Sequence, residues 1–310
     1  KLTAQSPAVP SAVKRGTINS ATLAMQDRYI SLISSFFSPD FLRGKTIVLD
    51  CAHGATFDLA PTIFKRFGAT VITIGTEPDG HNINKQCGTT HPLSLQKKVL
   101  RTGADAGFAF DGDGDRMIAV NQHGAILDGD NILALLIDHP VYTHAHTIVG
   151  TVVSNGGLAE YCKQRGKLFV RTAVGDKNIG SYLQKNRLLL GGEASGHIIA
   201  ADYLSSGDGI FAALRVLEGI SFRNNWSMTT FERHPHALVN IPAQTKVDLT
   251  QEPFASIIAE SIAALPNGRL IVRYSGTEPV LRVVGEDRDQ EFIQNVVTEL
   301  AKKLRPLISG

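Results

Sequence analysis

Short apolar runs of strand type alternate with helical segments along most of this sequence, and that alternation limits the possible folds more than any other feature. The runs at 46–50, 70–74 and 104–110 are separated by segments with helical periodicity. Such a pattern predicts a largely parallel sheet covered by helices. Ligands bind beyond the carboxyl ends of the strands in such sheets, so the loops at those ends are the natural places to search for chemistry.

The strand–helix rhythm occurs twice and then changes. A second α/β unit follows the first without a clear sequence repeat, and the last part reads as a strand, a helix, two strands and a final helix. We therefore expect two successive mixed α/β sheet domains followed by a smaller C-terminal α+β domain. The expected boundaries are a linker or remnant at 1–20, α/β domains at 21–121 and 122–231, and the α+β domain at 232–310.

Composition excludes several classes of protein. The chain of 310 residues is 43% hydrophobic and 19% charged, which suits packed cores rather than disorder. A net charge of +2, with no dense Lys/Arg run, gives no reason to expect nucleic-acid or membrane-surface binding. No apolar stretch approaches the roughly 20 residues of a membrane span. Cys51, Cys87 and Cys162 are widely spaced, which fits a reducing cytoplasm.

An acidic loop, Asp111-Gly-Asp-Gly-Asp-Arg116, follows the apolar run that ends at Phe110. The carboxylates of Asp111, Asp113 and Asp115 would repel one another unless a cation offset their charge. The two intervening glycines let the backbone bend until the oxygens converge. Hard oxygen ligands without Cys or His suit Mg²⁺, so we expect a magnesium site here.

Two other interpretations of the acidic loop stay open from its residues. An EF-hand calcium loop begins with similar Asp spacing, but it needs Gly at its sixth position and usually Glu at its twelfth. Those positions hold Arg116 and Gln122, and strand-like runs flank the loop. The second alternative is a solvated acidic turn without a ligand, because Asp and Gly are common turn residues.

A glycine-rich loop between two apolar strands carries Glu193, Ser195 and His197 at alternate positions. Alternate side chains of an extended loop share one side, so this row can bind the hydroxyls of a sugar. Histidine side chains can gain and lose a proton near neutral pH, so His197 is a candidate proton relay. The alternative is a glycine-rich hairpin with a buried, hydrogen-bonded histidine.

A third polar loop lies between the last two strands. Gly276 frees the backbone so that amides can point inward, and Ser275 and Thr277 add hydroxyl donors. Arg273 and Arg282 supply guanidinium groups that can grip a phosphate through paired hydrogen bonds. The alternative is an ordinary β-turn with incidental hydroxyls.

The three loops, in this order, resemble those of the α-D-phosphohexomutase superfamily. Its members carry a metal loop DGDGDR, a sugar loop GExSGH and a phosphate loop RxSGTEP, which match 111–116, 193–197 and 273–279. Residues 50–56, 78–84 and 174–176 narrow the resemblance to the bacterial phosphoglucosamine mutase family. This resemblance covers nearly the whole chain from about residue 20 onward.

The resemblance implies reversible conversion of glucosamine 6-phosphate to glucosamine 1-phosphate, for amino-sugar and cell-wall precursor synthesis. A phosphoserine would give its phosphoryl group to the sugar, and the resulting bisphosphate would return the other group. In the family that serine lies in an additional N-terminal domain, in a loop resembling TASHNP, which this sequence does not contain. We therefore expect residues 21–310 to correspond to the second, third and fourth domains, with the first needed for catalysis.

The resemblance also assigns roles to the loops. The three aspartates would hold Mg²⁺ against the phosphoserine, Arg116 would contact the transferring phosphoryl group, and the sugar loop would fix the ring, with His197 among the catalytic residues. Lys177, where such mutases often have Arg, is a candidate substrate contact or a solvated surface charge, and Ala194 leaves the polar row of the sugar loop intact. The expected partner is a phosphosugar, and a homodimer is among the expected assemblies. The alternatives are a phosphomannomutase/phosphoglucomutase and a non-catalytic sugar-phosphate-binding protein.

Overall fold

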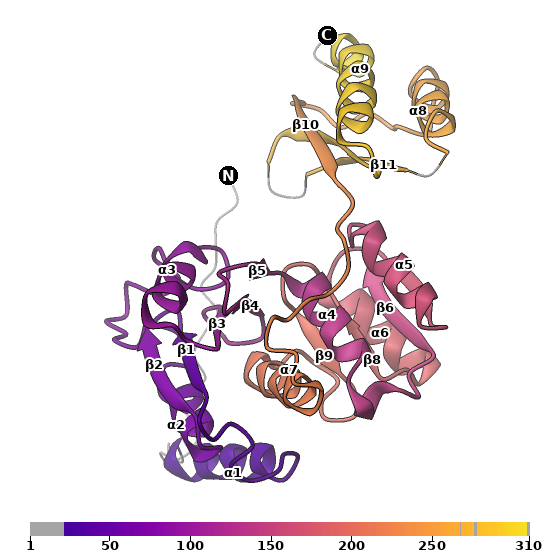
Figure 1. Cartoon of the computed structure of the whole chain (residues 1–310). Helices are drawn as coiled ribbons and strands as arrows, with labels where there is room; N and C mark the ends of the chain where they lie inside the picture. Colours follow the sequence, from indigo (N-terminus) through magenta and orange to yellow (C-terminus); the bar gives the residue numbers. More distant parts are fainter. Residues whose placement is uncertain (1–21, 267, 276–277, 309–310) are drawn as a thin grey trace, which may run out of the picture.

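The structure is a computed structural model that describes residues 22–266, 268–275 and 278–308. Strands in this part of the chain form three sheets, which follow one another along the sequence (Figure 1). The predicted fold class is confirmed, since two mixed sheets with helices precede a smaller antiparallel sheet. None of the described helices is long and apolar enough to cross a membrane.

The first sheet has the strand order β2-β1-β3-β4-β5. Strand β1 pairs in parallel with β2 and β3, and β4 returns antiparallel to β3. The acidic loop is therefore the turn of a hairpin at the carboxyl end of β3. The strands are β1 (Thr46–Asp50), β2 (Thr70–Ile74), β3 (Ala106–Phe110), β4 (Met117–Asn121) and β5 (Ile126–Leu127), and the helices are α1 (Thr22–Ser34), α2 (Leu59–Arg66) and α3 (Leu93–Thr102).

Strand β3 is buried on both faces, as expected for a strand covered by helices on each side. Phe108 and Phe110 belong to the main core, whereas Ala109 faces the smaller cluster beneath α3. Gly107 allows α3 to approach closely, because a Cβ atom there would lie 2.5 Å from the side chain of Val99. Small residues on one face and aromatic residues on the other thus fix the orientation of the strand that carries the acidic loop.

The second sheet, of order β7-β6-β8-β9, repeats this plan. Strand β6 pairs in parallel with β7 and β8, and β9 returns antiparallel to β8. The predicted sugar loop, residues 193–197, is the turn between β8 and β9, so this loop and the acidic loop both follow the carboxyl end of a parallel strand. The strands are β6 (Thr147–Thr151), β7 (Leu168–Thr172), β8 (Leu190–Gly192) and β9 (Ile198–Ala200), and the helices are α4 (Gly129–Ile137), a 3-10 turn (Pro140–Tyr142), α5 (Gly156–Gln164), α6 (Asp176–Asn186) and α7 (Gly209–Arg223).

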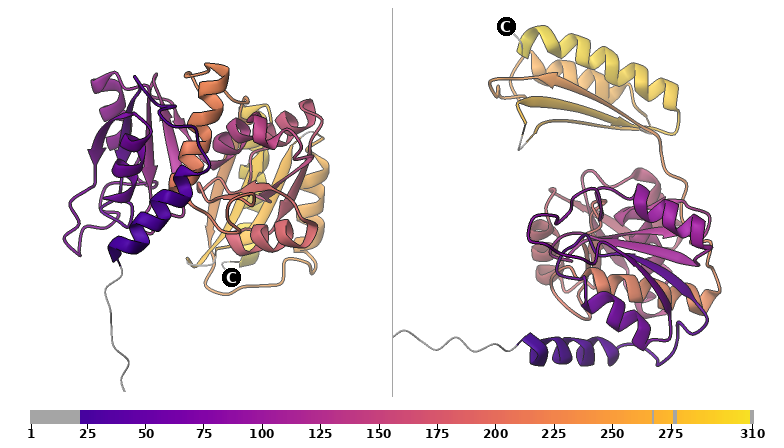
Figure 2. Two further views of the ribbon diagram at one scale, coloured as in Figure 1. Left: turned by 90° about the horizontal axis from the view of Figure 1, so that it is seen from below. Right: turned by 90° about the vertical axis from the view of Figure 1, so that its left-hand side faces the viewer.

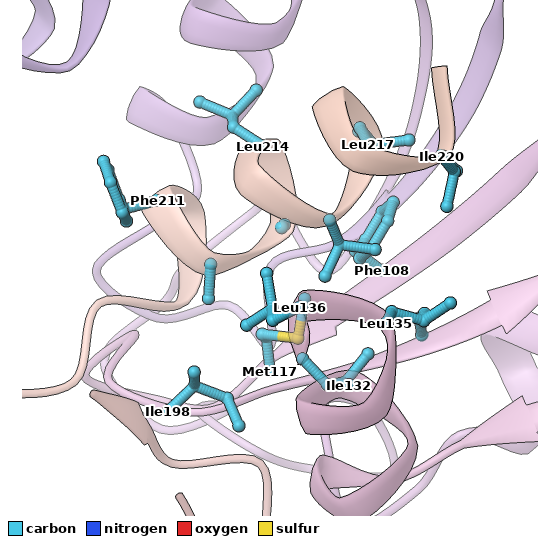
Figure 3. Packing of buried hydrophobic residues seen from close by; sticks show 14 of the residues in the cluster. Phe108, Met117, Ile132, Leu135, Leu136, Ile198, Phe211, Leu214, Leu217 and Ile220 are labelled. Carbon is cyan, nitrogen blue, oxygen red and sulfur yellow. The ribbon is translucent and has the colours of Figure 1, made fainter. Parts of the chain in front are cut away.

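Helix α7 joins the first two sheets through one continuous core. Its residues 209–220 are all buried, as expected for a helix that is covered on every side. Side chains of α7 and α4 gather around Met117 and Phe108 of the first sheet (Figure 3), and Ile198 of β9 lies in the same cluster. The acidic loop and the sugar loop are consequently held by the same packed interior.

The third sheet is antiparallel, with the order β10-β12-β11. Helices α8 and α9 cover one of its faces (Figure 2), and the core there is separate from the main one. An extended segment leads from α7 to this sheet (Figure 1). The elements are β10 (His236–Pro242), α8 (Phe254–Ala263), β11 (Arg269–Tyr274), β12 (Val280–Glu286) and α9 (Gln290–Ile308).

One expected helix is shorter than its apolar pattern suggests. The sequence favours a helix from Ala55, but α2 begins at Leu59. Residues Ala52 and His53 have φ values of 53° and 50°, and the amide of Ala55 donates to the carbonyl of Gly112 at 2.8 Å. The segment before α2 is therefore a loop, and one of its amides bonds to the acidic loop rather than to a helix carbonyl.

Candidate functional site

The acidic loop folds around the buried carboxylate of Asp111. Its Oδ1 accepts hydrogen bonds from the amides of Gly114 (3.2 Å) and Arg116 (3.1 Å). Its Oδ2 accepts a bond of 2.6 Å from Nε of Arg116. Gly114 has a φ of +80°, a conformation that L side chains rarely adopt, so the second glycine of the motif makes the turn.

The three aspartates of the acidic loop converge as predicted. One carboxylate oxygen from each of Asp111, Asp113 and Asp115 lies within 4.8 Å of the others. Arg116 offsets part of their charge, since its Nε also lies 3.4 Å from Oδ1 of Asp115. Exposure increases from the buried Asp111 to the exposed Asp113, so the cluster opens toward solvent on one side.

The arrangement fits a hard divalent cation. All the converging donors are oxygens, and Oδ1 of Asp115 is buried without a hydrogen-bond partner among the described residues. A buried carboxylate oxygen without a partner is costly, and a metal ion would supply the missing interaction. The cluster is therefore a candidate metal site.

The sugar loop is a tight turn whose carboxylate is held from two directions. Oε1 of Glu193 accepts from the amide of Gly175 at 2.7 Å, and Oε2 accepts from the hydroxyl of Ser195 at 3.2 Å. Glu193 is partly buried and Ser195 is exposed. The bond to Gly175 brings the first turn of α6 beside the sugar loop, where Lys177 is exposed to solvent.

The structure joins the acidic and sugar loops directly. Arg116 and His197 form an antiparallel backbone bridge, and the amide of Met117 donates to the carbonyl of Gly196 at 3.1 Å. A Cβ atom on Gly196 would lie 2.2 Å from the carbonyl oxygen of Met117, so only glycine permits this approach. The two motifs, distant in sequence, are thus adjacent in the fold.

His197 lies behind the acidic loop and is only 4% exposed. Its Nδ1 lies 3.2 Å from Oδ2 of Asp115, and its Nε2 accepts from the amide of Gly207 at 3.2 Å. Both ring nitrogens therefore face protein groups. The sequence-based expectation that this imidazole contacts the sugar or relays a proton stays a prediction.

Two further segments support the acidic loop, and the sequence did not predict either contact. A Cβ atom on Gly54 would lie 2.3 Å from the carbonyl oxygen of Gly112, and the amide of Gly209 donates to the carbonyl of Gly114 at 2.9 Å. Gly209 begins helix α7. Its role beside the acidic loop depends on tertiary contacts that a single sequence does not display.

A pocket of about 240 Å³ adjoins the acidic loop on the side of α1 and α7. At its edge Asp208 accepts bonds from the hydroxyls of Tyr29 (2.9 and 3.0 Å) and Tyr203 (3.0 Å). Burial raises the pKa of Asp208 above its usual value, and burial together with that carboxylate raises the pKa of Tyr29. Tyr29, Thr56, Asp113, Asp115, Gly207 and Asp208 are among the lining residues.

The predicted phosphate loop lies in the third sheet. Arg273 and Arg282 are directly opposite each other on β11 and β12, so two like charges share one face. The Nε atoms of both are buried without a partner among the described residues, although Arg282 also pairs with Glu278. Ser275 is buried and its hydroxyl accepts from the amide of Glu278 at 3.2 Å. The remaining members of this prediction, Gly276 and Thr277, lie outside the described residues.

No contact between the phosphate loop and the other two loops is found within residues 22–266, 268–275 and 278–308. The third sheet instead meets the second through Glu286, which accepts from the amide of Gly156 (2.5 Å) and from Arg269 (2.7 Å). Arg269 also donates to the carbonyls of Val152 (3.1 Å) and Ser154 (2.7 Å). The structure therefore assembles two of the predicted loops and places the third on a separate unit.

Comparison with known proteins gives the same order of domains. The α/β/α domain II of phosphoglucomutase/phosphomannomutase matches residues 27–124, the α/β/α domain III matches 128–235, and the C-terminal domain matches 238–303. A phosphoglucosamine mutase from Rhizobium leguminosarum is 40% identical over 285 residues, covering 89% of this chain and 63% of that protein. One from Clostridioides difficile is 40% identical over 295 residues, covering 92% and 65%. The chain thus spans less than two thirds of the length of the curated relatives it matches.

Solved structures share the fold. A phosphoglucomutase/phosphomannomutase family protein from Burkholderia thailandensis superposes with a TM-score of 0.75 at 23% identity, over 91% of this chain and 65% of that one. The N-acetylphosphoglucosamine mutase of Aspergillus fumigatus, solved in complex with GlcNAc-6P and magnesium, gives a TM-score of 0.70 at 19% identity, over 92% and 65%. With its three domains matched in order, the chain belongs to the α-D-phosphohexomutase superfamily.

Proposed function

We propose that this chain is the greater part of a phosphoglucosamine mutase, an intramolecular phosphotransferase that interconverts glucosamine 6-phosphate and glucosamine 1-phosphate. The identity of about 40% to curated phosphoglucosamine mutases supports this assignment. The observation that carries it is the backbone bridge between Arg116 and His197, which joins the acidic loop to the sugar loop. A cation and a sugar can then be held in one site.

Asp111, Asp113 and Asp115 would hold the metal ion, for which we propose Mg²⁺ because the donors are all hard oxygens. When bound, the ion supplies positive charge that stabilises the charge developing on a transferring phosphoryl group. Arg116 adds a guanidinium at the same place, with 43% of its side chain exposed. These residues form the phosphoryl-transfer end of the proposed site.

Glu193 and Ser195 would orient the sugar ring through its hydroxyls, and Lys177 at the start of α6 would assist. Arg273 and Arg282, with Ser275, Gly276 and Thr277, would bind the phosphate that is not reacting. An anion between the two opposed guanidinium groups would relieve their repulsion. Binding of this phosphate would orient the sugar, and closing the third sheet over the site would exclude water.

The remaining parts of the proposal concern the whole protein. The relatives are longer, so we propose that a further N-terminal domain supplies the phosphoserine, and that the chain divides near residues 121 and 231. A cytoplasmic location, a homodimer and a place in cell-wall precursor synthesis stay predictions.

The test is turnover by the native gene product, followed by ³¹P NMR with Mg²⁺ and a trace of glucose 1,6-bisphosphate as phosphoryl primer. We expect glucosamine 6-phosphate to be converted faster than mannose or glucose 6-phosphate. Faster conversion of the other two sugars would favour a phosphomannomutase/phosphoglucomutase, which the family description also covers. Binding without conversion of any of the three would leave a sugar-phosphate-binding protein.

A further inference from the structure

The two oxygens of Asp115 have different surroundings. Oδ2 lies 3.2 Å from Nδ1 of His197, whereas Oδ1 is buried and accepts no hydrogen bond from the described residues. Among the residues that the structure describes, the positive group nearest to Oδ1 is the guanidinium of Arg116, whose Nε lies 3.4 Å away. One oxygen of this carboxylate is thus placed against a protein donor, and the other is left for a ligand.

The surroundings of the imidazole fix which of its nitrogens carries the proton. The amide of Gly207 donates to Nε2 of His197 at 3.2 Å, and a backbone amide can only donate. Nε2 is therefore the acceptor, so the proton lies on Nδ1 and faces Asp115.

The ring has little freedom to leave this position. A Cβ atom on Gly207 would lie 2.6 Å from Nε2 of His197 and 2.6 Å from the carbonyl oxygen of Asp115, so the turn before α7 closes against both. The backbone bridge between Arg116 and His197 fixes the main chain that carries the ring. With 4% of its surface exposed, the ring is better placed to support the acidic loop than to reach a sugar.

We propose that His197 is a positioning residue of the metal site: its Nδ1–H group holds Oδ2 of Asp115 and keeps Oδ1 available to the cation, while the Gly207 amide sets the tautomer. The inference rests on the proposed metal site. Carboxylate ligands are commonly held by an outer donor of this kind, and losing such a donor typically weakens metal affinity about 10–100-fold.

Two substitutions distinguish the effect of losing the Nδ1 donor from the effect of losing the imidazole ring. The amide nitrogen of His197→Asn can take the place of Nδ1 and donate to Asp115. The longer His197→Gln carries its amide near the former Nε2, where it meets Gly207 instead. Calorimetric titration of the 310-residue chain with Mg²⁺ should give a Kd raised about 10–100-fold for His197→Gln and within about threefold of wild type for His197→Asn. The exposed His91→Gln is the matched control and should bind as wild type does.

The outcomes distinguish this inference from the proposed function. A wild-type chain that binds no Mg²⁺ overturns both. Wild-type affinity in His197→Gln, or equal losses in the two variants, overturns the positioning role and leaves the metal site standing. Melting temperatures measured without metal show whether each variant is folded. Should either variant unfold, ¹⁵N NMR of the wild-type imidazole decides the matter: a proton on Nδ1 supports the inference, and a proton on Nε2 refutes it.

Discussion

Arg116 and His197 pair through their backbones, although one follows β3 of the first sheet and the other precedes β9 of the second. Each belongs to a loop that leaves a parallel strand and returns as an antiparallel one. Because helix α7 packs against both sheets, this pairing is held by the main hydrophobic core. A ligand bound between the loops would therefore meet a rigid support on both sides.

The first prediction concerns the acidic loop. Asp113 is exposed, and its carboxylate accepts no hydrogen bond from the residues that the structure describes. Asp113→Ala should therefore leave the fold intact while removing a proposed metal ligand. A metal ion contributes several kcal/mol to phosphoryl transfer, so turnover by the native gene product should fall roughly 10³-fold or more. Asp58→Ala removes another exposed carboxylate, one that caps no helix amide, and should behave as wild type. Near-normal turnover in Asp113→Ala would remove the acidic loop from the mechanism.

The second prediction concerns Arg273. A charge-assisted bond to phosphate contributes about 1.5–3 kcal/mol, so Arg273→Ala should raise KM about 10–100-fold with a smaller change in kcat. Steady-state kinetics of the native gene product measures both constants. Arg43→Ala removes an exposed arginine that pairs with Asp40 and serves as the control. An unchanged KM in Arg273→Ala would count against the phosphate grip.

The third prediction concerns Glu286, which links the second and third sheets. Glu286→Ala removes the acceptor of the Gly156 amide and leaves Arg269 without its carboxylate, at a cost of about 1–3 kcal/mol. We expect limited proteolysis to cut the segment between α7 and β10 faster, with Mg²⁺ affinity unchanged. Glu286→Gln keeps an acceptor for the amide and should be cut at an intermediate rate. Equal cleavage of Glu286→Ala and wild type would show that this contact does not hold the sheets together.

The fourth prediction is a pH dependence of stability. Burial raises the pKa of Asp130 to about 6, against the amide of Asn155 and the charge of Arg233, which both lower it. The folded state therefore holds this proton more tightly than the unfolded state, whose carboxyl has a pKa of 3.8. This group's contribution to stability is consequently greatest below pH 4 and is lost as the pH rises through about 6.

Asp130→Asn removes that penalty while its amide oxygen can still accept from Asn155. At pH 7.5 the melting temperature of Asp130→Asn should exceed that of wild type, and the unfolding free energy should be higher by no more than about 3 kcal/mol. Both differences should vanish near pH 4. Thermal scans at both pH values measure them, with the exposed Asp27→Asn as control. A difference that grows toward low pH would contradict the raised pKa.

Much of the fold could be read from local patterns. The apolar runs at 46–50 and 70–74 are β1 and β2 with the expected bounds, and the side chain of Asn155 caps α5. Such signals are local, since burial and capping depend on neighbours in the sequence. The convergence of the three aspartates could also be predicted from local sequence, because a six-residue loop contains them all.

Long-range contacts could not be predicted from the sequence. Nothing near Gly175 indicates that its amide binds Glu193, and nothing near Gly207 indicates that it touches His197. A glycine whose absent Cβ makes room for another segment looks, in one sequence, like any turn glycine. A long-range contact also accompanies the shortened α2, because the amide of Ala55, in its first expected turn, donates to the carbonyl of Gly112 in the acidic loop.

The most direct test of a shared site is the relaxation of the ³¹P signal of bound glucosamine 6-phosphate when Mn²⁺ replaces Mg²⁺ in the chain. We predict strong paramagnetic broadening in wild type, which disappears in Asp113→Ala although the sugar phosphate still binds. If bound Mn²⁺ leaves the ³¹P relaxation of the bound sugar phosphate unchanged, the account is contradicted, because the cation and the sugar would then occupy separate sites.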